Sequence, residues 1–220
     1  MDSEVSTRLV RAGVEGKPNL AELLGKEPRM LASLLRWMLR RHQANAPGSF
    51  AYHRAKKIPV YTFFALGALE GIGTHLVLLV IFGSRWWVWT IFGLDMYTMI
   101  WILGLYASMI VLPHRIEADV LRLRHAYLAE LIVDRAAVRR ARMVGGGQSK
   151  SGKLMVDATG RGVFCSGDTT VAIDLDPEVP LRLGGLRVTD RVTTLHVTAD
   201  APRDFVAALT TMDSPADLVS

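Results

Sequence analysis

The feature that most constrains this chain is an apolar run from Ile58 to Leu112, interrupted once at Gly83-Ser84-Arg85. The run divides into segments 58–83 and 86–112. Each is longer than the roughly 20 helical residues that cross a hydrocarbon core of about 30 Å. Because a backbone in lipid must satisfy its own hydrogen bonds, two adjacent segments of this kind predict two helices. The sequence therefore predicts a transmembrane hairpin.

Positive charge is concentrated before the first span. The net formal charge of the 220 residues is +5, and residues 1–57 hold 11 Lys and Arg against 5 Asp and Glu. The connection between the spans holds only Arg85, whereas Arg54, Lys56 and Lys57 precede the first span. The positive-inside rule then predicts a multi-pass protein of the plasma membrane with both termini cytoplasmic. The partner that this charge predicts is anionic lipid of the inner leaflet, and nucleic acid is not expected.

Residues 29–43 have the pattern of a basic amphipathic helix. Apolar side chains recur at intervals of three and four residues, and the arginines fall largely on the other side. Such a helix suits the surface of the inner leaflet, and packing on the soluble domain or on a second protomer is the alternative. Residues 1–28 are predicted to be mobile. The predicted membrane-surface basic residues are Arg36, Arg40, Arg41, Arg54, Lys56 and Lys57.

Beyond Pro113 the pattern changes to short strands. Residues 119–124 alternate polar and apolar side chains, and residues 127–133 have the pattern of a hairpin partner. Further strands lead to a closing helix at 201–212, for which Asp200 is a candidate N-cap. The fold class is therefore an α+β membrane protein, with a transmembrane hairpin and a small cytoplasmic antiparallel β-barrel or β-sandwich at 114–212 closed by a C-terminal helix. Residues 213–220 form a tail.

With these pieces placed, the chain resembles a family of uncharacterised bacterial membrane proteins with two transmembrane helices and a pleckstrin-homology-like C-terminal domain. The resemblance implies a seven-stranded barrel closed at one corner by a helix, and it supplies no catalytic residues. The positions that carry it are Glu70, His75, Tyr97, Gly104, Pro113, 121–124, 170–177 and 192–205.

Three ionisable side chains, Glu70, His75 and Asp95, lie inside the apolar run. Counted from the turn, His75 and Asp95 have similar depths, so they can meet if their helical faces agree. Tyr97 is a candidate hydrogen-bond partner of Glu70. Because unpaired ionisable groups are costly in hydrocarbon, these residues are expected to face protein. The four form a predicted intramembrane polar cluster, either a structural clasp or a site for a ligand, a proton or a metal.

Apart from the metal alternative for that cluster, no catalytic residue, cofactor or metal site is predicted. The single cysteine, Cys165, excludes an intramolecular disulfide, and the Gly-rich loop at 145–152 lacks the spacing of a phosphate-binding loop. The predicted function is therefore that of a non-enzymatic, membrane-anchored scaffold or regulatory module. It presents its domain to a protein or lipid partner, as a homo-oligomer or with another membrane protein. The alternative is a subunit of a membrane enzyme or transporter that uses Glu70, His75 and Asp95.

Overall fold

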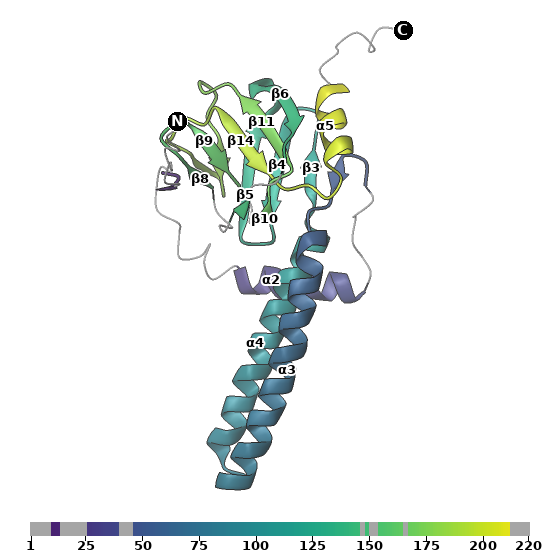
Figure 1. Ribbon diagram of the computed structural model, residues 1–220, viewed down its shortest axis with the longest axis vertical. Coiled ribbons are helices and arrows are strands. Elements are labelled where there is room, and N and C mark those ends of the chain that lie inside the picture. Colours follow the sequence, from purple (N-terminus) through teal and green to yellow (C-terminus); the bar gives the residue numbers. More distant parts are fainter. Residues whose placement is uncertain are drawn as a thin grey trace, which may run out of the picture.

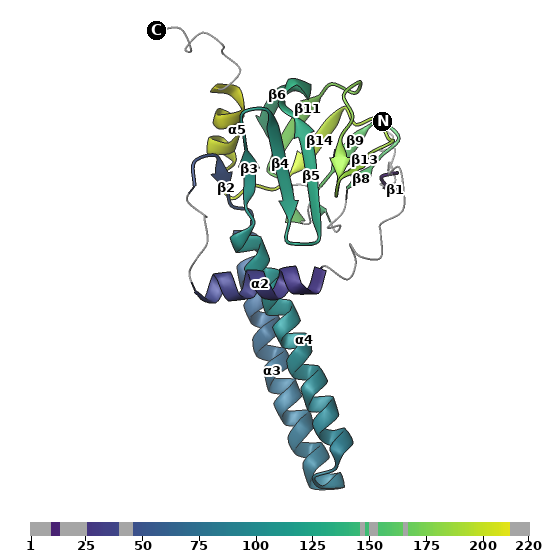
Figure 2. The same ribbon diagram turned by 180° about the vertical axis from the view of Figure 1, so that it is seen from behind.

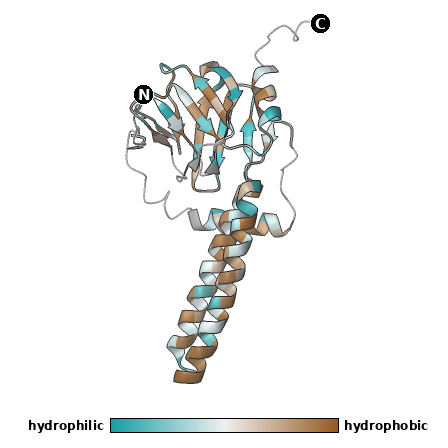
Figure 3. Ribbon diagram, viewed as in Figure 1, coloured by the Kyte–Doolittle hydropathy of each residue, from teal (hydrophilic) through white to brown (hydrophobic). Residues whose placement is uncertain are grey.

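A long helical hairpin projects from a β-sheet body (Figure 1). The computed structural model describes residues 10–13, 26–39, 46–145, 148–149, 154–164 and 167–211. The hairpin consists of α3 (Arg54–Phe82) and α4 (Trp86–Val111). Both helices are long and apolar enough, by length and composition, to cross a membrane. Most residues of both helices are apolar, whereas polar and apolar residues are interspersed in the body (Figure 3).

The turn between α3 and α4 is closed by local contacts. Gly83 has a φ of +69°, a conformation that costs glycine little and other residues more. The indole Nε1 of Trp89 donates a hydrogen bond to Ser84 Oγ at 3.0 Å. The turn between the helices therefore lies at Gly83-Ser84-Arg85, where the sequence predicts it.

The body contains two six-stranded sheets and a short ribbon. We call β1-β8-β9-β14-β11-β6 sheet one and β13-β12-β5-β4-β3-β2 sheet two, each in spatial order. All pairs are antiparallel except β9–β14, which is parallel. The strands of sheet one are β1 (Val10–Arg11), β8 (Met155–Val156), β9 (Arg161–Val163), β14 (Thr194–Val197), β11 (Val171–Leu175) and β6 (Val138–Met143). Those of sheet two are β13 (Leu186–Arg187), β12 (Arg182–Leu183), β5 (Ala129–Asp134), β4 (Val120–His125), β3 (His114–Ile116) and β2 (Ser49–Phe50). The ribbon pairs β7 (Gln148–Ser149) with β10 (Gly167–Asp168).

The body is not a closed barrel. No ladder joins the two sheets among the described strands, because the chain leaves β5, turns through the 3-10 helix η1 (Arg135–Ala137) and begins β6 in the other sheet. The barrel alternative and the closed barrel implied by the resemblance are therefore wrong, and the parallel β9–β14 pair makes sheet one mixed. Alternation of polar and apolar residues shows which face of a strand is buried, but it does not show which edges pair.

The core lies between the two sheets. Leu121, Leu123 and Leu131 of sheet two and Val171 and Ile173 of sheet one are fully buried in it. Helix α5 (Pro202–Thr211) covers one end through its own buried apolar side chains. Each such side chain contributes roughly 1.5–3 kcal/mol by leaving water.

The N-terminal segment also contributes to sheet one. Val10 and Arg11 pair with Val156 and Met155 of β8, and the N–H of Ala12 donates to Leu154 O at 3.0 Å. Part of the segment expected to be mobile is thus an edge strand. The rest of that segment, at 1–9 and 14–25, and the predicted tail lie outside the described residues, as does Cys165.

Candidate functional site

Both ends of the hairpin are held in one ladder of sheet two. β2 ends at Phe50, shortly before α3, and β3 begins at His114, directly after α4 and Pro113. The two strands pair with each other, with Ser49 opposite Arg115 and Phe50 opposite His114. The hairpin is therefore a continuation of two adjacent strands and is not joined to the body by a loose linker.

Asp200 fastens the first turn of α3 to the body. Its Oδ2 accepts hydrogen bonds from the backbone N–H groups of His53 at 3.0 Å and Arg54 at 3.1 Å, and its Oδ1 lies 3.2 Å from the same Arg54 nitrogen. The Asp200 N–H donates to Ala51 O at 2.8 Å. A carboxylate at this position also faces the positive end of the helix dipole. Asp200 was predicted to cap the C-terminal helix, but its carboxylate caps α3 instead.

A buried tyrosine–histidine pair lies beside this cap. The ring of Tyr52 stacks on His114, with centroids 4.3 Å apart, and Tyr52 Oη accepts a hydrogen bond from the Ala126 N–H at 2.7 Å. His114 Nδ1 accepts from the Arg124 N–H at 3.0 Å, and its Nε2 lies 3.0 Å from Thr198 O. Because the Arg124 donor requires an unprotonated Nδ1, the proton sits on Nε2 and is donated to Thr198.

Burial keeps two histidines of this junction neutral. Loss of hydration lowers the pKa of His114 from 6.5 to about 4; the Thr198 carbonyl opposes this, and the charges of His125 and Arg124 add to it. Burial likewise lowers the pKa of His125 to about 4, with a smaller effect from the charge of Lys56. The junction is therefore built for uncharged rings at neutral pH.

Helix α2 (Lys26–Met38) crosses α4 at the end of the hairpin nearest the body (Figure 2). Met30 and Ser33 are its buried side chains, and we call them the contact stripe. Met30 lies over Gly104 of α4, where a Cβ would be 2.7 Å from Met30 Cγ. Glycine at this position lets the two helices approach closely.

Replacing Gly104 with leucine is expected to displace α2, because even a Cβ collides with Met30. Overpacking of this kind costs roughly 1–3 kcal/mol. We expect trypsin to cleave within α2 of the detergent-solubilised chain roughly fivefold faster or more, measured by mass spectrometry of the fragments. Gly93→Leu on the same helix is the matched control, because a Cβ there meets nothing within 4 Å. Equal cleavage rates in the two variants would contradict this packing.

The two flanks of α2 differ in character. At about 100° per residue, Leu31, Leu35 and Met38 fall on one side of the contact stripe, and Arg29 and Arg36 fall on the other. The exposed fractions of the apolar side chains are 50%, 56% and 67%, respectively, and both arginines are exposed. One exposed flank is therefore apolar and the other basic. Arg40 and Arg41, also predicted to be basic surface residues, lie outside the described residues.

The remaining basic residues lie at the same end of the hairpin. Arg54 and Lys57 are exposed and Lys56 is half-buried in the first turns of α3. Together with Arg29 and Arg36 of α2 we call them the basic belt. The belt lies at the end of the hairpin nearest the body.

The structure does not pair His75 with Asp95. His75 is buried against the rings of Trp89 and Phe92, with centroids 4.9 Å and 4.4 Å away. Asp95 lies instead beside Gly71, where a Cβ would be 3.8 Å from the carboxylate. No ion pair joins His75 to Asp95, and His75 Nδ1 is buried without a hydrogen-bond partner among the described residues. The two residues are offset by about one helical turn.

Glu70 and Tyr97 lie on outer surfaces of the hairpin. Glu70 is exposed on α3, and Tyr97 is 46% exposed on α4. Glu70, which is expected to face protein, is therefore not covered by its own chain. Among the described residues no group of three His, Cys, Asp or Glu side chains could hold a metal ion. The structure therefore sets His75 apart from Asp95 and leaves Glu70 exposed.

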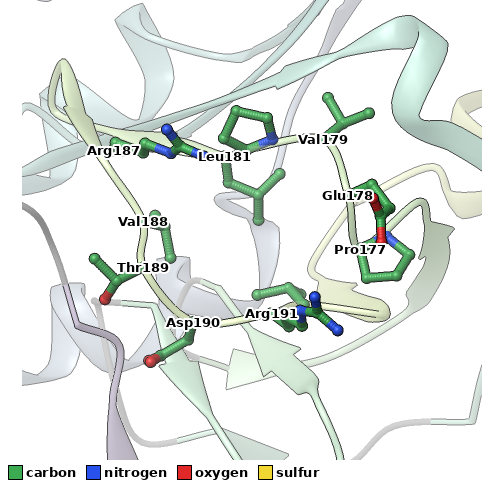
Figure 4. A pocket seen from close by; sticks show the side chains of 11 residues that line it. Pro177, Glu178, Val179, Leu181, Arg187, Val188, Thr189, Asp190 and Arg191 are labelled. Atoms are coloured by element: carbon green, nitrogen blue, oxygen red, sulfur yellow. The ribbon is translucent and has the colours of Figure 1, made fainter.

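A pocket of about 350 Å³ opens in the body, away from the hairpin, along residues 177–181 and 187–192. Its lining includes the buried side chains of Leu181, Val188 and Val192. Arg187 and Arg191 lie on either side of Leu181 (Figure 4). The surface of the pocket is therefore mostly polar, with two arginines among its lining residues.

No protein-family model, curated protein or solved structure matches the chain. The functional argument therefore rests on the junction, α2, the basic belt and the surfaces of the body.

Proposed function

We propose that this chain is an integral plasma-membrane protein whose hairpin spans the bilayer and holds the β-sandwich at the cytoplasmic surface. In this role the sandwich is a non-enzymatic scaffold or regulatory module that is presented to a partner. Both termini are cytoplasmic and the turn at Gly83 lies outside. This function accounts for the long apolar helices and for the excess of positive charge before them.

The observation that carries the proposal is the rigid junction. A protein that needed only an anchor could use any flexible linker, but here α3 and α4 continue the paired strands β2 and β3. Asp200, which follows the end of β14 by three residues, adds a carboxylate cap that joins the first turn of α3 to the body. Such a junction holds the sandwich in one orientation relative to the membrane, which is what the presentation of a particular face requires.

Helix α2 fits the same arrangement. Because α2 crosses α4, one of its flanks points along the hairpin and the other towards the sandwich (Figure 2). An apolar flank in the acyl region and a basic flank at the headgroups are typical of an interfacial helix on an anionic leaflet. The basic belt supplies the phosphate contacts.

Exposed Glu70 supports a partner within the membrane. In a spanning hairpin this carboxyl would lie at depth in hydrocarbon, where an uncovered ionisable group is costly. A homo-oligomer or another membrane protein would cover it. Such a partner gives Glu70 a role that does not require catalysis.

Cysteine labelling tests the proposed topology. In a Cys165→Ser background, a membrane-impermeant maleimide should modify Ser84→Cys in intact cells. It should modify Ser149→Cys only after permeabilisation. The reverse pattern would overturn the orientation, and modification of both positions in intact cells would overturn the spanning hairpin.

Two adjacent positions test the placement of α2. A fluorophore on Leu35→Cys should be quenched by spin-labelled lipid in vesicles that contain phosphatidylglycerol, because Leu35 belongs to the apolar flank. The matched variant Arg36→Cys lies on the basic flank and should respond to aqueous iodide instead. Iodide quenching of both positions would show that α2 does not lie in the interface.

A further inference from the structure

The outward face of sheet two carries a row of arginines that runs across the strands. The register places Arg115 opposite Arg122, Arg122 opposite Ile132, Ile132 opposite Arg182, and Arg182 opposite Arg187. Directly opposed residues of antiparallel strands share a face, so these side chains stand in line. At about 4.8 Å per strand, the row spans roughly 19 Å from β13 to β3. We call it the arginine row.

Two members of the arginine row are charges without a counterion. Arg122 pairs with Glu117 at 3.0 Å, and a neighbouring arginine, Arg124, pairs with Glu130 at 2.9 Å. Arg182 and Arg187 are both exposed, and neither makes an ion pair with any residue in the described part of the chain. Like charges directly opposite one another destabilise a sheet. No ion pair with a described residue offsets that cost at β12–β13.

The arginine row lies close to the hairpin but does not face the membrane plane. Arg115 lies four residues after Val111, the last residue of α4. The strands of sheet two stand along the hairpin axis, and α2 crosses beneath them on the same side of the molecule (Figure 2). The arginines therefore point sideways above the level of α2, so a flat bilayer would meet only the lower edge of this face.

The chemistry of the face favours an acidic polypeptide over a nucleic acid. Guanidinium groups bind carboxylates through paired hydrogen bonds. The outward-facing side chains of β3, β4, β5, β12 and β13 include no aromatic ring on which a base could stack. An extended segment of about six residues matches the length of the row.

We propose that the arginine row binds an extended, acidic polypeptide segment of a partner protein that lies along the cytoplasmic side of the membrane. The inference names the partner class of the proposed scaffold and rests on that function for the position of the membrane. Arg182 and Arg187 make the strongest contacts, because their charges are uncompensated. The segment can continue past Arg187 into the pocket that this residue lines (Figure 4).

Fluorescence anisotropy tests this binding. The full chain is placed in phosphatidylcholine nanodiscs and titrated against a fluorescein-labelled peptide with six glutamates in extended sequence. The double variant Arg182→Gln/Arg187→Gln should bind the peptide more weakly by a factor of roughly ten or more. The affinity of the wild-type chain for the peptide should fall steeply as the salt concentration rises. The matched control is Arg140→Gln/Arg203→Gln, which removes two exposed arginines elsewhere on the body and should change affinity less than twofold.

The competing ligands decide between partner classes. Equal affinity of the two double variants would overturn the proposal. Unlabelled peptide, a single-stranded oligonucleotide and phosphatidylserine vesicles are then compared as competitors at equal concentrations of negative charge. The proposal would also be overturned if the oligonucleotide or the vesicles displaced the labelled peptide more effectively than the unlabelled peptide does. Maleimide labelling at Ser84 and Ser149 does not depend on these arginines, so failure of peptide binding and failure of the topology are read separately.

Discussion

Replacing Asp200 with alanine is expected to lower the midpoint of thermal unfolding of the full chain by roughly 5–10 °C. The substitution removes the acceptor of the His53 and Arg54 N–H groups at the start of α3. The side chain of Asp200 is only 8% exposed, so water cannot readily replace it. Loss of a cap and of its charge-assisted hydrogen bonds costs about 2–3 kcal/mol. The measurement is differential scanning fluorimetry of the detergent-solubilised protein.

Two further variants make the Asp200 result specific. Asp200→Asn keeps an oxygen acceptor and should lose less than half as much stability, because asparagine also caps helices. Asp204→Ala removes an exposed carboxylate from the first turn of α5 and should shift the midpoint by less than about 2 °C. If Asp200→Ala and Asp204→Ala behaved alike, the cap would contribute nothing to stability.

The same variant also tests the rigid junction. Spin labels on Ser84→Cys in the hairpin turn and Leu128→Cys in the β4–β5 turn report the orientation of the hairpin relative to the body. In a Cys165→Ser background, Asp200→Ala should broaden the distance distribution, whereas Asp204→Ala should not. An unchanged distribution would show that the β2–β3 ladder alone fixes the orientation.

The hairpin could be predicted because its signal is local. Apolar runs of this length and the Gly83-Ser84-Arg85 break lie within one continuous stretch, and the helices at 54–82 and 86–111 nearly match the expected 58–83 and 86–112. The early start of α3 could not be predicted. It depends on Asp200, a residue 146 positions away from Arg54 whose carboxylate comes from the body.

The polar cluster shows where depth counting fails. Counting residues from the turn placed His75 level with Asp95, but the structure sets Asp95 against Gly71. The geometry of the turn shifts one helix along the other by about one turn, and the face of each side chain depends on that shift. Glu70 was named from sequence for the same reason as His75, yet only His75 is buried.

The arginine row was missed because it exists only in the assembled sheet. Alternation of arginine with leucine in 121–124 and 182–183 was visible in the sequence and indicated strands. That Arg182 stands beside Ile132 depends on the pairing of β12 with β5, which are separated in the chain by four strands of sheet one, β6, β8, β9 and β11. Register between distant strands cannot be read from alternation. The same limitation explains why alternation could not decide between the barrel and the sandwich.

Acidification from pH 7 to pH 4 is expected to destabilise the junction through its neutral histidines. The folded pKa values of His114 and His125 are about 4, below the ordinary value of 6.5. The unfolded chain therefore binds protons that the folded chain rejects, so stability is complete above about pH 6.5 and falls as the pH drops towards 4. A shift of this size corresponds to about 3 kcal/mol for the fully buried ring of His114. Below pH 4 both states are protonated, and this contribution falls no further.

His114→Gln separates this effect from general acid denaturation. A glutamine can accept from the Arg124 N–H and donate to Thr198 O, as His114 does, but it does not titrate between pH 4 and 7. Urea unfolding of the solubilised chain, followed by circular dichroism at several pH values, should show a flatter dependence of the free energy of unfolding on pH for this variant.

His196→Gln is the control, because that half-buried ring lies on the outer face of sheet one. Burial and the charges of Arg161 and Arg142 lower its pKa by less, so its removal should flatten the curve by less. A pH dependence in His114→Gln as steep as in the wild-type chain would show that the Nε2-protonated ring is not what acid disrupts.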